Sequence, residues 1–363
     1  MSARHLYVHV PFCRRRCTYC DFSIAVRRRV PVRDYLAALA SEWARTERPA
    51  ALATVYLGGG TPSLLGADGV ARLADLVGAH AGLEEFTLEA NPEDVTDEAA
   101  RAWARAGVTR LSLGAQSFDP GVLAWMHRTH GPDAAAAAVA SARHAGIAVV
   151  SLDLIFALPD ALGRDLDADV DRLLALAPQH VSLYGLTVED HTPLGRAAAR
   201  GAVTPAGEQR YEAEYLRLHE RLGAEGYRFY EVSNAALPGF EAVHNRAYWR
   251  LAPYLGLGPS AHSFDGVARW WNEAAYARWR AALDRGASPV AGREILGPKQ
   301  RRLESLYLGL RTSDGVLLEE PLAPALAAAL SGWSAAGWAE VDAPRLRLTP
   351  KGWLRLDELA ASL

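Results

Sequence analysis

Cysteine and methionine are scarce in this chain of 363 residues, which has three of the first and two of the second. All three cysteines lie in one short stretch, so a framework of disulfides like that of small secreted domains is excluded. No apolar run approaches the ~20 residues of a membrane-spanning helix. The first residues also lack the charged and apolar regions of a secretory signal. We therefore expect a cytoplasmic protein without a transmembrane segment.

The chain also lacks a large surplus of positive or negative charge. The chain has 39 Lys and Arg residues against 42 Asp and Glu residues, a formal net charge of −3. Because binding to nucleic-acid phosphates needs a basic surplus, we expect no nucleic-acid partner. With 50% hydrophobic and 22% charged residues, the composition is typical of a globular protein and excludes a disordered chain or a coiled coil. The length allows one large α/β domain with one or two smaller attachments.

The three cysteines are Cys13, Cys17 and Cys20. An odd, clustered set of thiols in a reducing compartment indicates metal binding or redox chemistry. A structural zinc site needs four ligands, commonly in two separate pairs, and the chain has no second pair of cysteines. Iron–sulfur clusters usually take four cysteines, so three would leave one iron of a 4Fe-4S cluster open to an outside chelator.

Strand-like and helix-like patterns alternate over about the first 230 residues. Strands are expected at residues 6–12, 54–57, 86–89, 110–114, 149–156 and 180–186, and helices at 32–48, 68–80, 96–106, 132–145 and 166–176. Six β/α units in series predict a parallel sheet, which is either doubly wound or a barrel. Polar residues follow several strands at their carboxyl ends, where barrels build their active sites, and this favours the barrel.

The pattern changes after residue 230, so we divide the chain into residues 1–230, 231–290 and 291–363. The middle part is rich in aromatic residues, Gly and Pro and predicts loops and short strands over the barrel mouth. It should end with a helix at 273–286 and a connection at 289–297. The last part predicts a small α-rich domain, winged-helix-like, in which a strand at 346–348 precedes a capped helix.

The stretch PFCRRRCTYCDF around the cysteines resembles the signature of radical S-adenosylmethionine (SAM) enzymes. In that family the amino and carboxylate groups of SAM complete the cluster, and an electron from the cluster cleaves SAM to a 5′-deoxyadenosyl radical. The resemblance implies a 4Fe-4S cluster on Cys13, Cys17 and Cys20, with SAM on the open iron. It also implies an α/β fold, the radical SAM (β/α)6 partial barrel.

The resemblance extends to residues that would bind SAM. The GGGTP segment is similar to the family segment that holds the methionine end of SAM. The other residues that match SAM-binding positions of the family are single residues spread along the barrel. The implied SAM-binding residues are Tyr7, Tyr19, Gly59, Gly60, Thr61, Glu89, Gln116, Arg128 and Asp153. Two simpler interpretations stay open. The glycines could form only a tight turn, and a core salt bridge between Arg128 and Asp153 could satisfy both buried charges without a ligand.

Within the radical SAM enzymes, the chain resembles the oxygen-independent coproporphyrinogen III oxidases and their relatives, the HemW haem chaperones. The resemblance rests on YVHVPFC, YEVSN, HNRAYW and YLGLGPSAHSF and covers nearly the whole chain. The oxidases carry a further cysteine two positions after the last cluster cysteine, together with an extended N-terminal segment. Here Phe22 occupies that position and only twelve residues precede Cys13. Both differences favour the haem-chaperone subgroup.

The HNRAYW stretch is similar to the HNxxYW motif associated with haem binding in that subgroup. The resemblance implies that His244 ligates haem iron and that Tyr248 and Trp249 flank the macrocycle. His262 is a second candidate ligand. From the residues alone, His244 could equally be a hydrogen-bonded packing residue.

The function implied is that of a haem chaperone that binds a 4Fe-4S cluster, SAM and haem and passes haem to an acceptor protein. The alternatives are an oxygen-independent coproporphyrinogen III oxidase and a radical enzyme acting on another large anionic substrate. Arginine fills positions 14–16 and 27–29, beside the cysteines. These arginines form either a solvated basic face or a surface that attracts porphyrin propionates or an acidic reducing partner for the cluster.

Overall fold

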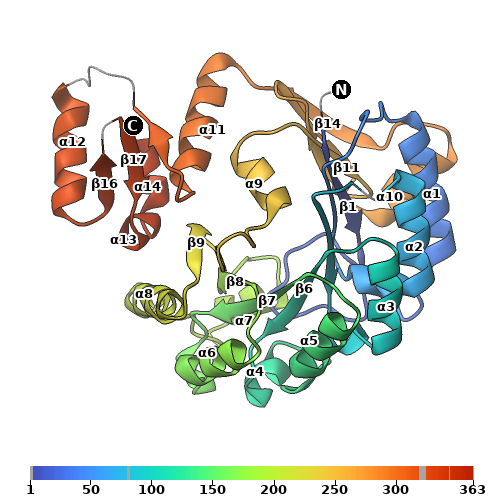
Figure 1. Cartoon of the computed structure of the whole chain (residues 1–363), viewed down its shortest axis with the longest axis horizontal. Helices are drawn as coiled ribbons and strands as arrows, with labels where there is room; N and C mark the ends of the chain where they lie inside the picture. The colour runs from blue at the N-terminus through green and yellow to red at the C-terminus, as the bar shows by residue number, and fades with distance from the viewer. Residues whose placement is uncertain (1–2, 80–81, 319–323, 343, 363) are drawn as a thin grey trace.

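The computed structural model of the chain describes residues 3–79, 82–318, 324–342 and 344–362. One sheet of twelve strands dominates the molecule (Figure 1). Six parallel strands at its centre lie side by side in chain order: β1 (His5–Val10), β4 (Thr54–Gly59), β5 (Glu85–Ala90), β6 (Arg110–Gln116), β7 (Val149–Phe156) and β8 (His180–Gly185). The predicted strands and the six-unit α/β architecture are therefore confirmed.

Helices connect these strands and lie along the outer side of the curved sheet (Figure 1). Five of them match the predicted helices to within a few residues: α1 (Val32–Arg45), α2 (Gly66–Val77), α3 (Asp97–Arg105), α5 (Ala134–His144) and α6 (Leu166–Ala175). The predicted end of the second helix at His80 lies outside the described residues. Three more were not predicted: α4 (Pro120–Trp125), α7 (Pro193–Ala199) and α8 (Glu208–Ala224). No helix in the described part of the chain is long and apolar enough to cross a membrane.

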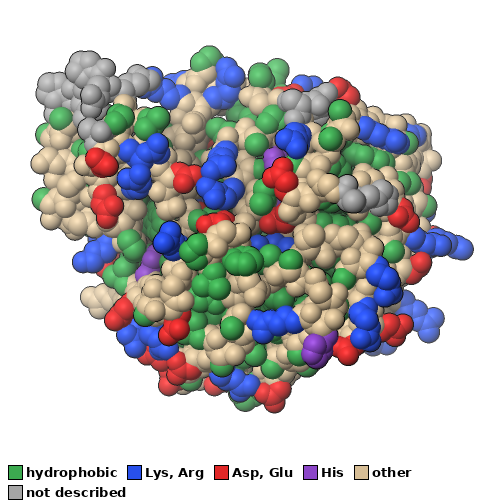
Figure 2. All heavy atoms as spheres, in the orientation of Figure 1, with side chains coloured by type: hydrophobic (Ala, Val, Ile, Leu, Met, Phe, Trp, Pro, Cys, Tyr) green, Lys and Arg blue, Asp and Glu red, His purple; other side chains and the backbone are tan. Residues whose placement is uncertain are grey.

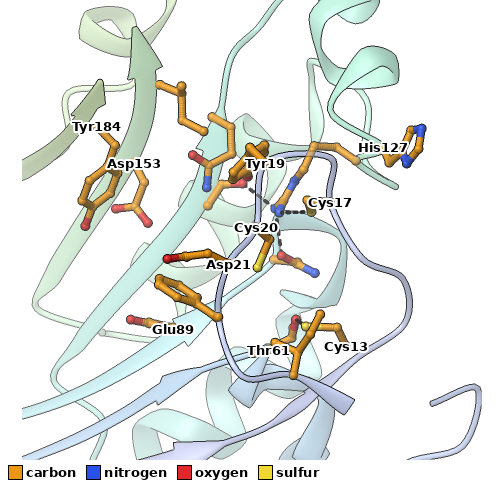
Figure 3. Close-up of a pocket in the computed structure, with 18 of the residues that line it drawn as sticks. Cys13, Cys17, Tyr19, Cys20, Asp21, Thr61, Glu89, His127, Asp153 and Tyr184 are labelled. Carbon is orange, nitrogen blue, oxygen red and sulfur yellow. Dashed lines mark hydrogen bonds between the residues drawn. The ribbon is translucent and has the colours of Figure 1, made fainter. Parts of the chain in front are cut away.

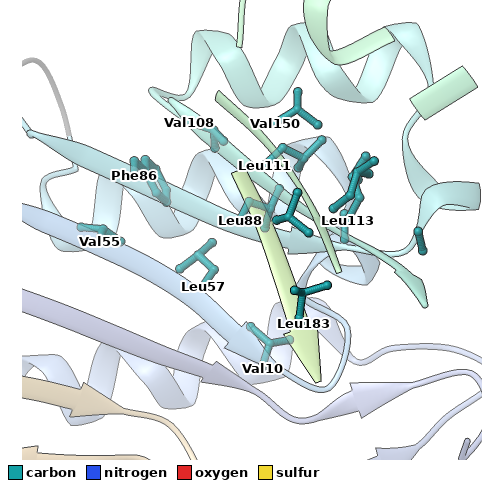
Figure 4. Packing of buried hydrophobic residues seen from close by; sticks show 14 of the residues in the cluster. Val10, Val55, Leu57, Phe86, Leu88, Val108, Leu111, Leu113, Val150 and Leu183 are labelled. Atoms are coloured by element: carbon teal, nitrogen blue, oxygen red, sulfur yellow. The ribbon is translucent and has the colours of Figure 1, made fainter. Parts of the chain in front are cut away.

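Successive side chains along the central strands point to opposite sides of the sheet, which gives the sheet one apolar face and one polar face. Leu88, Leu111 and Val150 are neighbours across β5, β6 and β7, and all three are fully buried. Figure 4 shows them in the layer between the sheet and the outer helices. Glu89 lies one position after Leu88, and Asp153 lies three positions after Val150. Both separations are odd, so both carboxylates lie on the inner face of the barrel. The same alternation that builds the core therefore supplies the polar lining.

Two short strands, β2 (Phe12–Cys13) and β3 (Ala25–Val26), pair in parallel and enclose the stretch with the three cysteines. At the far edge of the sheet, β10 (Asn234–Ala236) and β9 (Arg228–Glu231) add antiparallel strands beside β8.

The middle part of the chain extends the sheet at its other edge. Strand β11 (Tyr254–Leu257) pairs in parallel with β1, and β12 (His262–Phe264), β13 (Ala268–Asn272) and β14 (Val290–Ile295) follow in antiparallel order. The predicted helix is present as α10 (Tyr276–Asp284). The predicted connection at 289–297 is wrong, because most of it forms β14, whose backbone pairs with β13 along its length.

Helix α9 (Val243–Trp249), which carries the whole HNRAYW motif, lies at the amino ends of the barrel strands. The carboxylate of Glu85, the first residue of β5, accepts hydrogen bonds from the amides of Val243 and His244 at 2.9 and 3.1 Å. These are free amides of the first helical turn, which need an outside acceptor. The helix therefore closes the end opposite to the mouth, and our expectation that this segment covers the mouth is wrong for α9.

The C-terminal part forms a small domain beside the barrel (Figure 1). Its elements are α11 (Pro298–Leu310), α12 (Pro324–Ala335), α13 (Pro350–Trp353), α14 (Leu356–Ala361) and a three-stranded antiparallel sheet of β15 (Val316–Leu317), β17 (Arg345–Leu348) and β16 (Ala339–Asp342). Within this domain the Trp353 indole of α13 donates to the carbonyl of Leu310 at 3.0 Å and joins α13 to α11. Helices with a small sheet agree with the predicted winged-helix-like domain. Figure 2 shows charges of both signs interspersed on this face of the molecule.

Candidate metal and cofactor centre

A cavity of about 400 Å³ opens at the carboxyl ends of the barrel strands. Figure 3 shows the cysteine loop on one side of it and Glu89, Asp153 and Tyr184 on the other. Most of the predicted site residues line it: Cys13, Cys17, Tyr19, Cys20, Gly59, Gly60, Thr61, Glu89, Gln116, Arg128 and Asp153. Residues from six separate segments of the chain therefore meet at one place.

The thiols of the cysteine loop meet two hydrogen-bond donors. The Thr61 hydroxyl lies 3.4 Å from the Cys13 Sγ, and Nη1 of Arg128 lies 3.7 Å from the Cys17 Sγ. Burial raises the pKa of the Cys13 thiol to about 11 and also raises that of Cys20. Cys13 and Cys20 therefore hold their protons more strongly than an ordinary thiol, and a metal that binds them would have to displace those protons.

The donor set suits an iron–sulfur cluster. All three thiols are free and partly exposed to the same cavity. Among the residues that the structure describes, no three Cys, His, Asp or Glu side chains are grouped as ligands of a single metal ion. A 4Fe-4S cluster needs no such grouping, because each cysteine sulfur binds a different iron atom.

The glycines after β4 allow the backbone to approach the cysteine strand closely. A Cβ at Gly60 would lie 2.8 Å from the carbonyl oxygen of Phe12, and Gly59 has a φ of +111° that L side chains rarely adopt. A Cβ at Gly59 would also meet the His9 ring at 2.6 Å. These two glycines are therefore fixed by their surroundings, and they leave a backbone wall that a ligand can approach.

Two carboxylates face the cavity from the inner face of the barrel. Glu89 accepts hydrogen bonds from the Tyr56 hydroxyl at 2.7 Å and from the Gly59 amide at 3.1 Å, and burial raises its pKa to about 7. Asp153 accepts from the Ser112 hydroxyl at 3.1 Å, and burial raises its pKa to about 6. Both carboxylates would gain from donors on a ligand, such as an amino group or ribose hydroxyls.

Arg128 does not pair with Asp153 in the described residues. Its Nη2 donates to Asn91 Oδ1 and to the carbonyl of Gly114, both at 2.8 Å, and its Nη1 faces Cys17. The interpretation of this pair as a core salt bridge is therefore wrong, because Arg128 is held by acceptors at the cysteine side of the cavity.

Two polar atoms at the same place are buried without a hydrogen-bond partner among the described residues: Nε of Arg128 and Oε1 of Gln116. Gln116 also has a φ of 68°, an uncommon conformation for a residue other than glycine. Unpaired buried polar atoms and backbone strain both occur at functional sites. The cavity therefore offers unused hydrogen-bonding capacity to a polar ligand.

Tyr7 does not line the cavity. Its hydroxyl lies 3.1 Å from Nδ1 of His9, and its ring stacks on Tyr56 behind the glycine segment. Sequence analysis missed the contributions of Tyr56 and Tyr184. The sequence contains a signal for both, since each lies on a predicted strand at a position that alternates with buried leucines.

The HNRAYW residues lie away from this cavity. Nδ1 of His244 is hydrogen-bonded to the Thr54 hydroxyl at 2.7 Å and Nε2 to the Tyr248 hydroxyl at 2.8 Å. The His244 side chain is 0% exposed, and burial lowers its pKa to about 3. Trp249 lies on the other face of α9, and His262 is exposed with its ring stacked on Trp271. Iron ligation by His244 stays a prediction.

The fold and the three-cysteine cavity define a radical SAM protein. The Radical SAM superfamily matches residues 7–173 of the chain. The solved structure of coproporphyrinogen III oxidase from Escherichia coli, described as a radical SAM enzyme, superposes with a TM-score of 0.84 over 99% of this chain and 90% of that one. Its sequence is 22% identical, so this likeness establishes the fold.

Sequence relatives define the family more narrowly. The heme chaperone HemW of Mycobacterium tuberculosis is 38% identical over 99% of this chain and 94% of its own length. The heme chaperone HemW of Lactococcus lactis is 36% identical over 86% of this chain and 83% of its own length. The chain belongs to the HemW family.

Proposed function

We propose that this protein is a haem chaperone, which binds a 4Fe-4S cluster, SAM and haem and transfers haem to an acceptor protein. The observation that carries the proposal is the end-to-end match to relatives named as heme chaperones, which includes the C-terminal domain. The reducing cytoplasm is the location that suits three free cysteines with a metal-binding role.

The cavity residues fit the two cofactors of the family. Cys13, Cys17 and Cys20 would hold the cluster, while Thr61 and Arg128 donate hydrogen bonds that stabilise sulfur charge. The backbone at 59–60 would contact SAM, with Glu89 and Asp153 as acceptors for its amino group and ribose hydroxyls. When bound, the cluster supplies one electron to the carbon–sulfur bond of SAM.

Phe22 favours the chaperone over the oxidase. Its side chain is 59% exposed and lines the cavity beside the cysteine loop. It occupies the position where the resemblance places the further cysteine of the oxidases. A phenyl ring cannot deliver a proton or a hydrogen atom to a substrate as a thiol can.

We also propose that an acidic protein reduces the cluster by docking on the arginines of the cysteine loop. Arg14, Arg15 and the three arginines at 27–29 are exposed around the loop. Within the described part of the chain, Arg14 alone among these arginines forms an ion pair, at 2.7 Å to Asp94. A group of exposed cations next to a redox centre raises the rate of encounter with an acidic partner at low salt.

The test is anaerobic reconstitution with iron and sulfide, followed by parallel titrations with haem and coproporphyrinogen III in the presence of SAM and a reductant. We expect saturable haem binding with a shifted Soret band and no decarboxylation. If the protein releases carbon dioxide from coproporphyrinogen III and Cys17→Ser does not, the protein is an oxidase and the chaperone proposal is wrong. Absence of any saturable haem binding would also overturn the proposal.

A further inference from the structure

The connection between α4 and α5, residues 126–133, contacts the cysteine loop through its backbone. The carbonyl of Met126 accepts a hydrogen bond from the Thr18 amide at 3.3 Å, and the carbonyl of His127 accepts one from the Arg15 guanidinium at 3.4 Å. His127 has a φ of 60°, in the left-handed region that residues other than glycine rarely adopt. A strained conformation of this kind persists only where the surrounding contacts hold it.

Arg128 is the residue of this connection that reaches a cysteine. Its Nη1 lies 3.7 Å from the Cys17 Sγ, while its Nη2 is hydrogen-bonded to Asn91 and to the carbonyl of Gly114. Positive charge and N–H donors beside the sulfur ligands favour the reduced, more negative state of an iron–sulfur cluster. The position of Arg128 therefore bears on the reduction potential of a bound cluster.

His130 fixes the connection to the barrel. Its side chain is buried, with 1% of its surface exposed. The Nε2 of the ring lies 3.1 Å from the carbonyl oxygen of Ala115 on β6, and Nδ1 lies 3.4 Å from Oε2 of Glu93. Both ring nitrogens therefore face acceptors that belong to the barrel.

Glu93 contacts two neighbouring residues of the connection. Besides facing His130, its carboxylate accepts a hydrogen bond from the Thr129 hydroxyl. Although burial raises the pKa of Glu93, the hydrogen bonds from His130 and Thr129 lower it to about 2, so the carboxylate is ionised at neutral pH. Glu93 lies two residues after Asn91. The segment that follows β5 therefore holds Arg128 through Asn91 and the next two residues through Glu93.

We propose that Glu93 and His130 are positioning residues of the cluster site, which hold Arg128 against Cys17 and thereby raise the reduction potential of the bound cluster. This rests on the proposed function, in which the three cysteines hold a 4Fe-4S cluster. Neither Glu93 nor His130 belongs to the described lining of the cysteine cavity. Both therefore act on the cluster through the connection that carries Arg128.

Two effects of Glu93→Ala on the reduction potential have opposite signs. Removal of a negative charge near the cluster raises the potential, because the reduced cluster is the more negative state. Displacement of Arg128 takes a cation and an N–H donor away from the Cys17 sulfur and lowers the potential. The sign of the measured shift therefore shows whether Glu93 acts through its own charge or through Arg128.

The experiment is a redox titration of the reconstituted full-length chain, followed by the paramagnetic signal of the reduced cluster. Glu93→Ala, His130→Ala and Arg128→Ala should contain as much iron and sulfide as the wild type. Each should have an equilibrium constant for reduction that is about tenfold lower, which for a one-electron couple is about 59 mV. Glu98→Ala and His144→Ala, at exposed positions on α3 and α5, are the matched controls and should leave the potential unchanged.

The double variant Glu93→Ala/Arg128→Ala should show no further fall below Arg128→Ala alone, because the two residues act through one contact. A raised or unchanged potential in Glu93→Ala, or an additive fall in the double variant, would overturn the inference. If circular dichroism shows that Glu93→Ala is unfolded, Thr129→Val decides: a lowered potential supports the inference and an unchanged one overturns it. Failure of the wild-type chain to form a cluster would instead refute the proposed function.

Discussion

Cys13, Cys17 and Cys20 have different surroundings although they share one loop. Thr61 donates to the first, Arg128 to the second, and the backbone carbonyl of Cys20 accepts a hydrogen bond from Arg16 at 3.2 Å. Thr61 follows β4, whereas Arg128 lies between α4 and α5. Folding of the barrel therefore sets where the sulfur atoms lie, although the residues that carry them are contiguous.

At the residue scale, we predict that replacing any one of the three cysteines with serine abolishes the reconstituted cluster. Hydroxyl oxygen is a poor ligand for iron in such a cluster, and the loop has no fourth thiol to substitute. Visible absorbance and the paramagnetic signal of the reduced state measure the loss. The thermal unfolding of the apo-protein should not change, because the cysteines lie outside the core. A complete cluster in all three variants would contradict the prediction.

A second prediction at this scale concerns Arg128. Arg128→Ala should weaken SAM binding to the reconstituted protein by about 1–3 kcal/mol, because it removes a buried guanidinium with an unused donor at the cavity. Arg105→Ala, an exposed arginine on α3, is the matched control. Equilibrium dialysis with labelled SAM gives the affinities. Unchanged SAM affinity combined with a lowered unfolding temperature would assign Arg128 a purely structural role.

At the scale of elements, Glu42 joins α1 to the strands added at the β1 edge. Its buried carboxylate accepts hydrogen bonds from the amide of Gly258 at 2.9 Å, from the indole of Trp279 at 3.1 Å and from the side chain of Asn272. Burial raises its pKa to about 7 from an ordinary value of 4.5, although the three donors partly offset the effect. The carboxylate thus links elements that lie more than two hundred residues apart in the chain.

We predict that Glu42 makes the free energy of unfolding fall as the pH rises from about 5 to 8. The carboxyl loses its proton in the unfolded chain at lower pH than in the folded one, so unfolding releases a proton in this window and higher pH favours it. Relative to Glu42→Gln, the wild-type apo-protein should lose on the order of 2–3 kcal/mol across it. Urea unfolding of both proteins at pH 5 and pH 8 measures this difference. A difference that is constant or grows with pH would contradict the prediction.

At the scale of the whole molecule, the barrel separates two cavities. The cysteine cavity lies at the carboxyl ends of the strands, and a second cavity, of about 750 Å³, is lined by residues of α9 and of the C-terminal domain. Distant sites without shared residues contribute independently to binding. A ligand in the second cavity would therefore be held by groups that the cluster does not touch.

We accordingly predict that the cluster-free variant Cys17→Ser binds hemin with an affinity within about threefold of the wild-type value. Titrations followed at the Soret band give both affinities. A loss of more than about tenfold in Cys17→Ser alone would place haem in contact with the cluster site instead.

The sequence by itself determined the position of the three-cysteine loop, the six β/α units and the family. These rest on local information: a contiguous thiol motif, the alternation of apolar residues in strands such as 86–90, and short segments that relatives share. Glu89 and Asp153 were predictable because a period of two fixes their face once the neighbouring leucines are buried. The C-terminal domain was predictable for a similar reason, since its strand and capped helix adjoin in sequence.

Only the tertiary structure decided what Arg128, His244 and residues 290–295 contact. Each depends on a partner remote in sequence: Arg128 on Asn91, His244 on Thr54 at a separation of 190 residues, and β14 on its pairing with β13. A motif such as HNRAYW states which residues are present, whereas helical geometry and the Glu85 carboxylate that binds its first turn decide which of them face solvent. Side-chain direction follows from packing between distant segments, and a local pattern does not contain that information.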